Sequence, residues 1–168
     1  MKTRILWVCG IVALAAAMAS AQTKTTMSGK CGKPDVQQSV PAGDREGHVF
    51  MLSQGTCTVT GSVNGAAAKT GAFSEHGEVT PTRMRTWGVY TVTFDTGDKI
   101  SYDYQAIGTM KDGKLQTETN KYQIAGGTGK MKGLKGSGTC KLNGTSDGGV
   151  DYSCTGENTS GGGTMAKP

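Results

Sequence analysis

Three tyrosines have the spacing of side chains that share one face of a β-hairpin, where phenol rings can bind an apolar or aromatic molecule. Tyr90 and Tyr102 flank a turn sequence at residues 95–98, and a fold about its centre places them nearly opposite each other. Tyr104 follows two residues after Tyr102 and points to the same face, because side chains alternate along a strand. Such rings either line a ligand cavity inside a small barrel or fill the barrel interior, and the spacing alone leaves both interpretations open.

Two further kinds of residue extend this candidate ligand site. Trp87 is near Tyr90 in the sequence and can add aromatic surface. Catalysis of a cyclisation or isomerisation would need a buried charged residue that faces the cavity, and Glu118 and Asp103 are the first candidates. We therefore predict a ligand-binding set of Tyr90, Tyr102, Tyr104, Trp87 and Glu118, and the sequence assigns no catalytic residue.

The sequence lacks the motifs that carry nucleophilic or metal-dependent catalysis. HExxH does not occur. GxSxG occurs once, as GTSDG at residues 144–148, but inside a turn expected between two strands, whereas a nucleophile elbow joins a strand to a helix. His48 and His76 have no recognisable nucleophile motif beside them. The cysteines form no CxxC pair, so we predict no metal site and no cofactor. Glu75 and Glu78 flank His76 in a glycine-bounded segment that we expect to be an exposed loop.

A glycine-rich segment at residues 126–131, GGTGKM, is similar in its letters to a phosphate-binding loop. A Walker loop has Ser or Thr after the lysine and then a helix, whereas this chain has Met131 and further glycines that disfavour a helix. We interpret the segment as a bend between strands at a barrel corner. Four lysines either attract an anionic surface or keep a strand face solvated: Lys130, Lys132, Lys135 and Lys141. Tyr122 is the one aromatic residue nearby, so we expect no nucleic-acid partner.

The fold that positions these residues has to be built from few apolar side chains. Residues 22–168 contain 26 Gly and 22 Thr in 147 positions, and Leu, Ile, Val and Phe together occupy only 19. The same stretch has a net charge of +3, which is too small for a typical disordered chain of this composition. Thr and Tyr also favour strands. The composition indicates one domain, and it excludes a helical bundle, a large α/β enzyme and a multi-pass membrane protein.

The N-terminus has the organisation of a signal peptide. Lys2 and Arg4 precede an apolar run at residues 5–18, and Ala19-Ser20-Ala21 gives the small-x-small pattern of a cleavage site. The alternative is a membrane anchor, but the alanine-rich run and the cleavage pattern favour a mature chain that starts at Gln22. We therefore expect a secreted or periplasmic protein with no transmembrane segment after processing.

Four cysteines remain after removal of the signal peptide, and in an oxidising compartment they imply two disulfides. Spacing alone allows three pairings. The strands expected on either side of a turn at residues 144–149 form a hairpin, and one of its two registers brings Cys140 opposite Cys154. That pairing is favoured and leaves Cys31 to pair with Cys57. Each bond would add roughly 2–4 kcal/mol to the stability of a lean core.

From residue 48 onward, short strands alternate with turn sequences, most clearly at residues 86–94 and 99–107. We expect separate strands on either side of Gly55, and a short helical turn is an alternative at residues 63–70. The pattern predicts an antiparallel sandwich or barrel, and closure would protect the edges of so lean a sheet. The expected organisation is a signal peptide (1–21), an N-terminal arm (22–46), a β-barrel domain (47–156) and a disordered tail (157–168).

The run YQIAGGTGKMKGLKGSGT at residues 122–139 resembles the allene oxide cyclase-like barrel group, which includes the dirigent-like proteins. In that group an aromatic strand leads into GGTGK, an aromatic residue and a glycine, and then into GxGT at the last hairpin. The resemblance extends over roughly residues 89–156 and implies an eight-stranded antiparallel barrel with a central cavity, often in a homo-oligomer. Met131 replaces the usual aromatic residue, and the active-site residues of the group have no counterparts here. The resemblance therefore implies the scaffold and not the activity.

These observations predict a disulfide-stapled barrel that binds a small, partly apolar molecule. A cyclase or isomerase that acts on a lipid-like or phenolic substrate is the first alternative. A structural or surface-interaction protein that uses its lysine-rich face is the second. The barrel interior distinguishes them, because an interior packed solid by side chains has no room for a ligand.

Overall fold

The computed structural model describes residues 22–160, which form nine β-strands and one short 3-10 helix. In chain order the elements are β1 (Thr23–Cys31), β2 (Val36–Pro41), β3 (Val49–Val63), β4 (Ala66–Val79), β5 (Arg83–Phe94), β6 (Lys99–Lys111), β7 (Lys114–Gly127), η1 (Gly129–Met131), β8 (Leu134–Gly144) and β9 (Val150–Ser160). Within the described residues, no helix has the length and apolar character needed to cross a membrane. The expected signal peptide and residues 161–168 of the expected tail lie outside the described residues.

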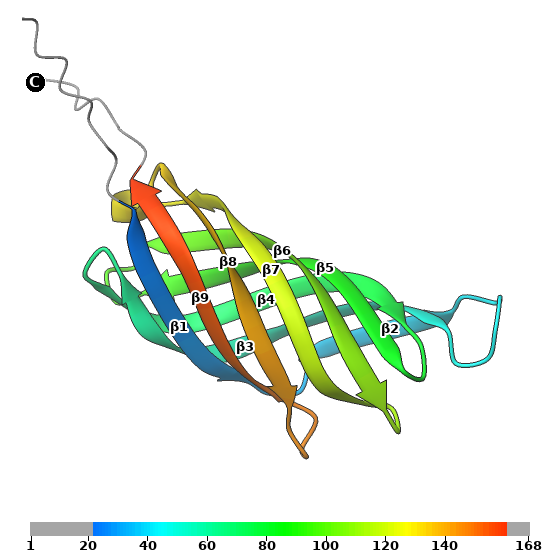
Figure 1. Ribbon diagram of the computed structural model, residues 1–168. Helices are drawn as coiled ribbons and strands as arrows, with labels where there is room; N and C mark the ends of the chain where they lie inside the picture. Colours follow the sequence, from blue (N-terminus) through cyan, green and yellow to red (C-terminus); the bar gives the residue numbers. More distant parts are fainter. Residues whose placement is uncertain (1–21, 161–168) are drawn as a thin grey trace, which may run out of the picture.

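The strands close into a barrel because β3 pairs along both of its edges. One edge of β3 carries β4, and the other carries β1 along residues 57–61 and β2 along residues 49–54. Each remaining strand pairs with its neighbour in the chain, and β9 pairs with β1 to complete the ring (Figure 1). Eight of the strands described therefore form the closed wall, and β2 extends it beyond the end of β1. This confirms the predicted all-β, closed antiparallel barrel.

The hairpin of β5 and β6 follows the alternation predicted from the sequence. Its buried inward side chains nearest the turn are Val92, Phe94, Ile100 and Tyr102. In the turn, Gly97 has a φ of +84°, a left-handed backbone that a residue with a Cβ rarely adopts. Tyr90 and Tyr102 are direct partners in the register, which confirms that the two residues lie opposite each other.

The N-terminal segment belongs to the barrel, so the predicted boundary between an N-terminal arm (22–46) and a barrel that begins at residue 47 is wrong. β1 pairs with β9 along its whole length, and its second half also pairs with β3. Thr25 and Met27 are buried on its inner side. At the other end of the chain, β9 continues through Ser160, so residues 157–160 are not part of a tail. Both segments carry little apolar surface, and their pairing partners rather than their own composition make them strands.

β3 and β4 are longer than predicted. Gly55 does not interrupt β3, which runs through this position. The residue is a glycine because the ring of Phe73 on β4 occupies the space of a side chain here, 2.7 Å from an added Cβ. No helical turn follows β3. Instead Asn64 and Gly65 have φ values of +49° and +78° and form a two-residue hairpin turn. An Asn-Gly pair is a strong signal for this type of turn.

Both disulfides join residues that face each other on neighbouring strands. Cys31 pairs with Cys57 between β1 and β3, with an S–S distance of 2.03 Å. Cys140 pairs with Cys154 between β8 and β9, with an S–S distance of 2.02 Å. The pairing favoured from the sequence is confirmed. The first bond lies at the seam where β1 closes the barrel, so it ties the two ends of the ring together covalently.

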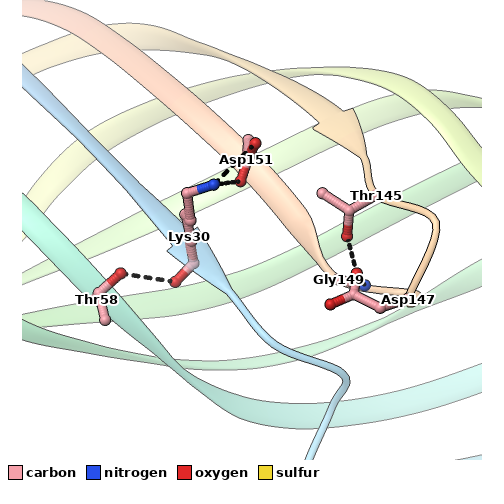
Figure 2. A network of polar contacts seen from close by, with 6 residues as sticks. All are labelled: Lys30, Thr58, Thr145, Asp147, Gly149 and Asp151. Carbon is pink, nitrogen blue, oxygen red and sulfur yellow. Dashed lines mark hydrogen bonds and ion pairs between the residues drawn. The ribbon is translucent and has the colours of Figure 1, made fainter.

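Polar contacts lie on the outer side of β1 and in the neighbouring β8–β9 turn (Figure 2). Across the β1–β9 pair, Lys30 Nζ lies 3.2 Å from a carboxylate oxygen of Asp151, and the Thr58 hydroxyl on β3 donates to the Lys30 carbonyl. In the β8–β9 turn, the carboxylate of Asp147 accepts hydrogen bonds from the Thr145 hydroxyl and from a backbone N–H two residues later. The ion pair is exposed and contributes less than about 1 kcal/mol. Strand pairing and the disulfide therefore hold the seam.

The interior of the barrel has a packed half and a hollow half. The packed half lies near the β3–β4 and β5–β6 turns, where the helix η1 lies across the end of the barrel (Figure 1). Met131 of η1 has an exposed fraction of 0% and packs into this core. The other buried apolar side chains of the cluster include Val63, Val92, Phe94, Ile100, Ile124 and Leu134. Side chains leave a cavity toward the opposite end, where the β6–β7 and β8–β9 turns lie.

Candidate ligand-binding cavity

A cavity of about 300 Å³ occupies the hollow half of the barrel. It reaches the end of the barrel beside three connections between strands, at Gly32, Gly113 and Gly148. All five tyrosines of the chain line it: Tyr90, Tyr102, Tyr104, Tyr122 and Tyr152. Four methionines also line it: Met27, Met51, Met84 and Met110. The wall thus includes aromatic and thioether surface, which is polarisable and accommodates varied apolar shapes.

The tyrosine rings pack against one another in two pairs. Tyr102 and Tyr122 have ring centroids 5.3 Å apart in an edge-to-face arrangement. Tyr90 and Tyr152 have centroids 6.1 Å apart, and their hydroxyl oxygens are 2.8 Å apart. Burial raises the pKa of all five phenols, so each ring is neutral at physiological pH.

Glycines on neighbouring strands provide the space that the inward tyrosines need. A Cβ added at Gly71 would lie 1.9 Å from the hydroxyl oxygen of Tyr90. Added Cβ atoms at Gly138 and Gly156 would lie 2.3 Å and 2.2 Å from the hydroxyl oxygen of Tyr122. These contacts are far below any real separation of heavy atoms. The glycine-rich composition is therefore partly a requirement of the aromatic interior.

Two carboxyl groups, Glu75 on β4 and Glu118 on β7, face the same cavity. The hydroxyl of Tyr104 donates to Glu75 Oε2 at 2.7 Å. Burial raises the pKa of Glu75, and the hydrogen bond from Tyr104 partly offsets this rise. Burial, together with the negative charge of Glu75, raises the pKa of Glu118 to about 7. Glu118 can therefore hold or release a proton near neutral pH.

The structure brings four of the five predicted ligand-binding residues together. Tyr90, Tyr102, Tyr104 and Glu118 line the cavity. Trp87 does not: it lies on the outer face, with its ring stacked 6.0 Å from His76 and the guanidinium of Arg85 lying 5.4 Å from its centroid. Tyr90 lies three positions after Trp87, an odd step along the strand, so the two side chains point to opposite faces of β5. Asp103 is likewise exposed on the outer wall, for the same reason of strand alternation.

Sequence reasoning missed Glu75 and two of the tyrosines. Glu75 was expected in an exposed loop, but it is inside because β4 continues as a strand through residues 75–78. Tyr122 lies four residues after Glu118 on β7, and this even separation indicates the same face. Tyr152 lies two residues before the disulfide-bonded Cys154, which also faces inward. Strand alternation was a sufficient signal for both tyrosines once one residue on each strand was placed inside.

The glycine-rich segment at residues 126–131 contacts the chain itself. The backbone N–H of Lys130 donates to a carboxylate oxygen of Asp98 at 3.2 Å, and a Cβ at Gly129 would collide with the same carboxylate. The Thr128 hydroxyl accepts from the N–H of Lys99 at 2.8 Å. These contacts join the β7–η1 connection to the β5–β6 turn, as a bend at a barrel corner requires. Among residues 22–160, no group of three or more His, Cys, Asp or Glu side chains could hold a metal ion.

Comparison with known proteins gives one structural likeness to report. No family model matches the chain, and no curated protein matches it. A solved structure of a pterocarpan synthase dirigent protein is similar over 88% of this chain and 90% of that chain, with 15% sequence identity and a TM-score of 0.47. Pterocarpan synthesis is a property of that protein. What this chain does has to follow from its own cavity.

Proposed function

We propose that this chain is an exported barrel protein that binds a small, partly apolar molecule in the hollow half of the barrel. The observation that carries the proposal is the cavity of about 300 Å³, whose wall combines aromatic rings with a few converging polar groups. Small-molecule sites typically have this composition and volumes of about 300–1,000 Å³, so the ligand is at the small end of the range. The two formed disulfides support export, because such bonds persist in oxidising compartments.

Native mass spectrometry of the disulfide-intact protein tests binding, and it also gives the number of chains in any homo-oligomer. We expect a retained compound that denaturation releases. A variant that fills the cavity, Leu142→Trp, should lose this compound, whereas Ile107→Trp on the exposed outer wall should keep it. An empty wild-type protein that also shows no thermal shift with extracts of its source would contradict the proposal.

The same experiment tests export. The mature chain should start at Gln22 and weigh four hydrogens less than its fully reduced form, because two disulfides remove two hydrogens each. A protein that retains residues 1–21 after expression in a secretory host would contradict removal of a signal peptide.

A second candidate function is acid–base catalysis of an isomerisation or cyclisation of a lipid-like or phenolic substrate. Two carboxyl groups in one cavity favour it, because Glu75 is hydrogen-bonded to Tyr104 while Glu118 titrates near neutral pH. Groups with such different environments can donate and accept a proton in one reaction. The test is turnover of the retained compound. Glu118→Gln should abolish turnover while the compound still binds measurably, and a compound that never changes leaves binding as the function.

A further inference from the structure

We infer that the molecule held in the barrel is an amine, with its ammonium group bound beside Glu75 and Glu118 and its apolar part packed against the tyrosine rings. This inference rests on the proposed function, because it names the class of ligand for the same cavity. It follows from the two carboxyl groups that line the cavity and from the lack of a basic side chain beside them among the described residues.

Among the described residues, neither carboxyl group forms an ion pair with a basic side chain. His76 follows Glu75 in the chain and its charge slightly lowers the pKa of Glu75, but its ring lies on the outer wall against Trp87 and outside the cavity. The residues directly opposite them on the neighbouring strands are all uncharged: Ser53 and Gly88 beside Glu75, and Gly108 and Leu142 beside Glu118. Among the described residues that line the cavity, Lys114 is the one basic residue, and it is exposed at the β6–β7 turn. Buried carboxylates without a counter-ion are costly, and an ammonium group inside the cavity would supply one.

An unused hydrogen-bond acceptor lies next to the carboxyl groups. Asn120 follows Glu118 by two residues on β7 and lines the same cavity. Its side-chain oxygen Oδ1 is buried and has no hydrogen-bond donor among the described residues. Buried acceptors normally have a donor, so this atom indicates a donor that arrives with the ligand. A primary ammonium has three N–H donors, as many as the three acceptor groups that Glu75, Glu118 and Asn120 present to the cavity.

The aromatic wall suits the same ligand. The face of a phenol ring carries negative potential and attracts an ammonium group, which is how aromatic cages bind cationic ligands. All five rings are neutral and lie in the cavity with the two carboxyl groups. The methionine side chains provide apolar surface for the rest of the molecule. A carboxylate ligand, in contrast, would meet two like charges and no cation beside them.

Three probes with one carbon skeleton and three different charges test the inference: 4-phenylbutylamine, 4-phenylbutan-1-ol and 4-phenylbutanoate. Their binding to the disulfide-intact protein is measured by calorimetry at about pH 8, where Glu118 is ionised. We expect the amine to bind about tenfold more tightly than the alcohol, as a charge-assisted hydrogen bond allows, and the carboxylate to bind more weakly than both. Equal affinities, or preference for the carboxylate, would overturn the inference and leave a barrel that binds small molecules without regard to charge.

Variants separate the charge from the shape of the cavity. Glu118→Gln and Glu75→Gln should each weaken amine binding about fivefold and change alcohol binding by less than about twofold. Glu46→Gln makes the same chemical change in the exposed β2–β3 loop and should alter neither. Two independent cavity variants keep the test valid if one of them fails to fold. Unchanged amine affinity in a folded cavity variant would refute the assigned site. No binding of any probe, together with an empty native mass spectrum, would refute the proposed function itself.

Discussion

Replacing Glu118 with glutamine should remove a pH dependence that this buried carboxyl gives to the stability of the barrel. Burial beside Glu75 raises the pKa of Glu118 from its ordinary value of 4.5 to about 7. Between these two pH values, the unfolded chain has released the proton while the folded barrel still holds it. The contribution of this group to stability is therefore complete below pH 4.5 and is lost as the pH rises through 7.

The size of the effect follows from the width of that interval. A difference of about 2.5 pH units, at roughly 1.36 kcal/mol per unit, gives a loss of about 3 kcal/mol between about pH 4.5 and pH 8. Burial also raises the pKa of Glu75, so this group adds a loss of the same sign. For a domain of this size, 3 kcal/mol is a large part of the total free energy of unfolding.

Urea unfolding followed by far-ultraviolet circular dichroism, at intervals from about pH 5 to about pH 8, measures this loss. The wild-type protein should become less stable across the range, and Glu118→Gln should show a flatter profile and exceed the wild type at the upper end. Glu46→Gln, which makes the same change at an exposed position, should follow the wild type. Parallel profiles for the wild type and Glu118→Gln would refute the assignment of a raised pKa to this carboxyl.

Three further sets of substitutions test the packed half, the glycine contacts and the seam. Met131→Ala should lower the free energy of unfolding by about 2–5 kcal/mol, because it empties a fully buried site; a loss below about 1 kcal/mol would mean that η1 does not plug the barrel. Gly138→Ala should cost about 1–3 kcal/mol in urea unfolding, because the added Cβ would lie 2.3 Å from a tyrosine hydroxyl and from a backbone carbonyl. Gly126→Ala, with nothing within 4 Å of its added Cβ, should be nearly neutral, and equal losses in the two variants would refute the steric argument. Replacement of Cys31 and Cys57 by alanine should cost about 3 kcal/mol for the open loop, and an unchanged urea midpoint would show that strand pairing alone closes the seam.

Local patterns in the sequence were enough to predict the parts of the fold that depend on local contacts. The β5–β6 hairpin follows from alternation and a turn sequence, and the Cys140–Cys154 pair follows from the register of a short hairpin. Closure of the ring could not be predicted from local patterns. β1 becomes a strand by pairing with β9 and β3, and β9 lies far away in the sequence. The threonines and lysines of β1 carry no alternating apolar signal, so tertiary context decides its structure.

The candidate site was predictable to the extent that each strand could be placed. Tyr90, Tyr102 and Tyr104 follow from the β5–β6 register, and the parity of positions along β5 should have excluded Trp87. Glu75 could not be placed inside without β4, whose start depends on the turn at Asn64 and Gly65. That Asn-Gly pair was the available signal for β4.

The separation of aromatic residues by the barrel wall gives this chain two independent optical signals. All five tyrosines face the cavity, whereas Trp87 lies outside it, and the other tryptophan of the chain belongs to residues 1–21. In a chain that starts at Gln22, as we propose, indole emission reports on the outer surface and phenol absorption reports on the barrel interior. Excitation energy can pass from the tyrosines, as donors, to Trp87, as acceptor, because only the strands of the barrel wall separate them. A molecule that enters the lumen would perturb the donors and leave the acceptor untouched, so occupancy can be followed without a label.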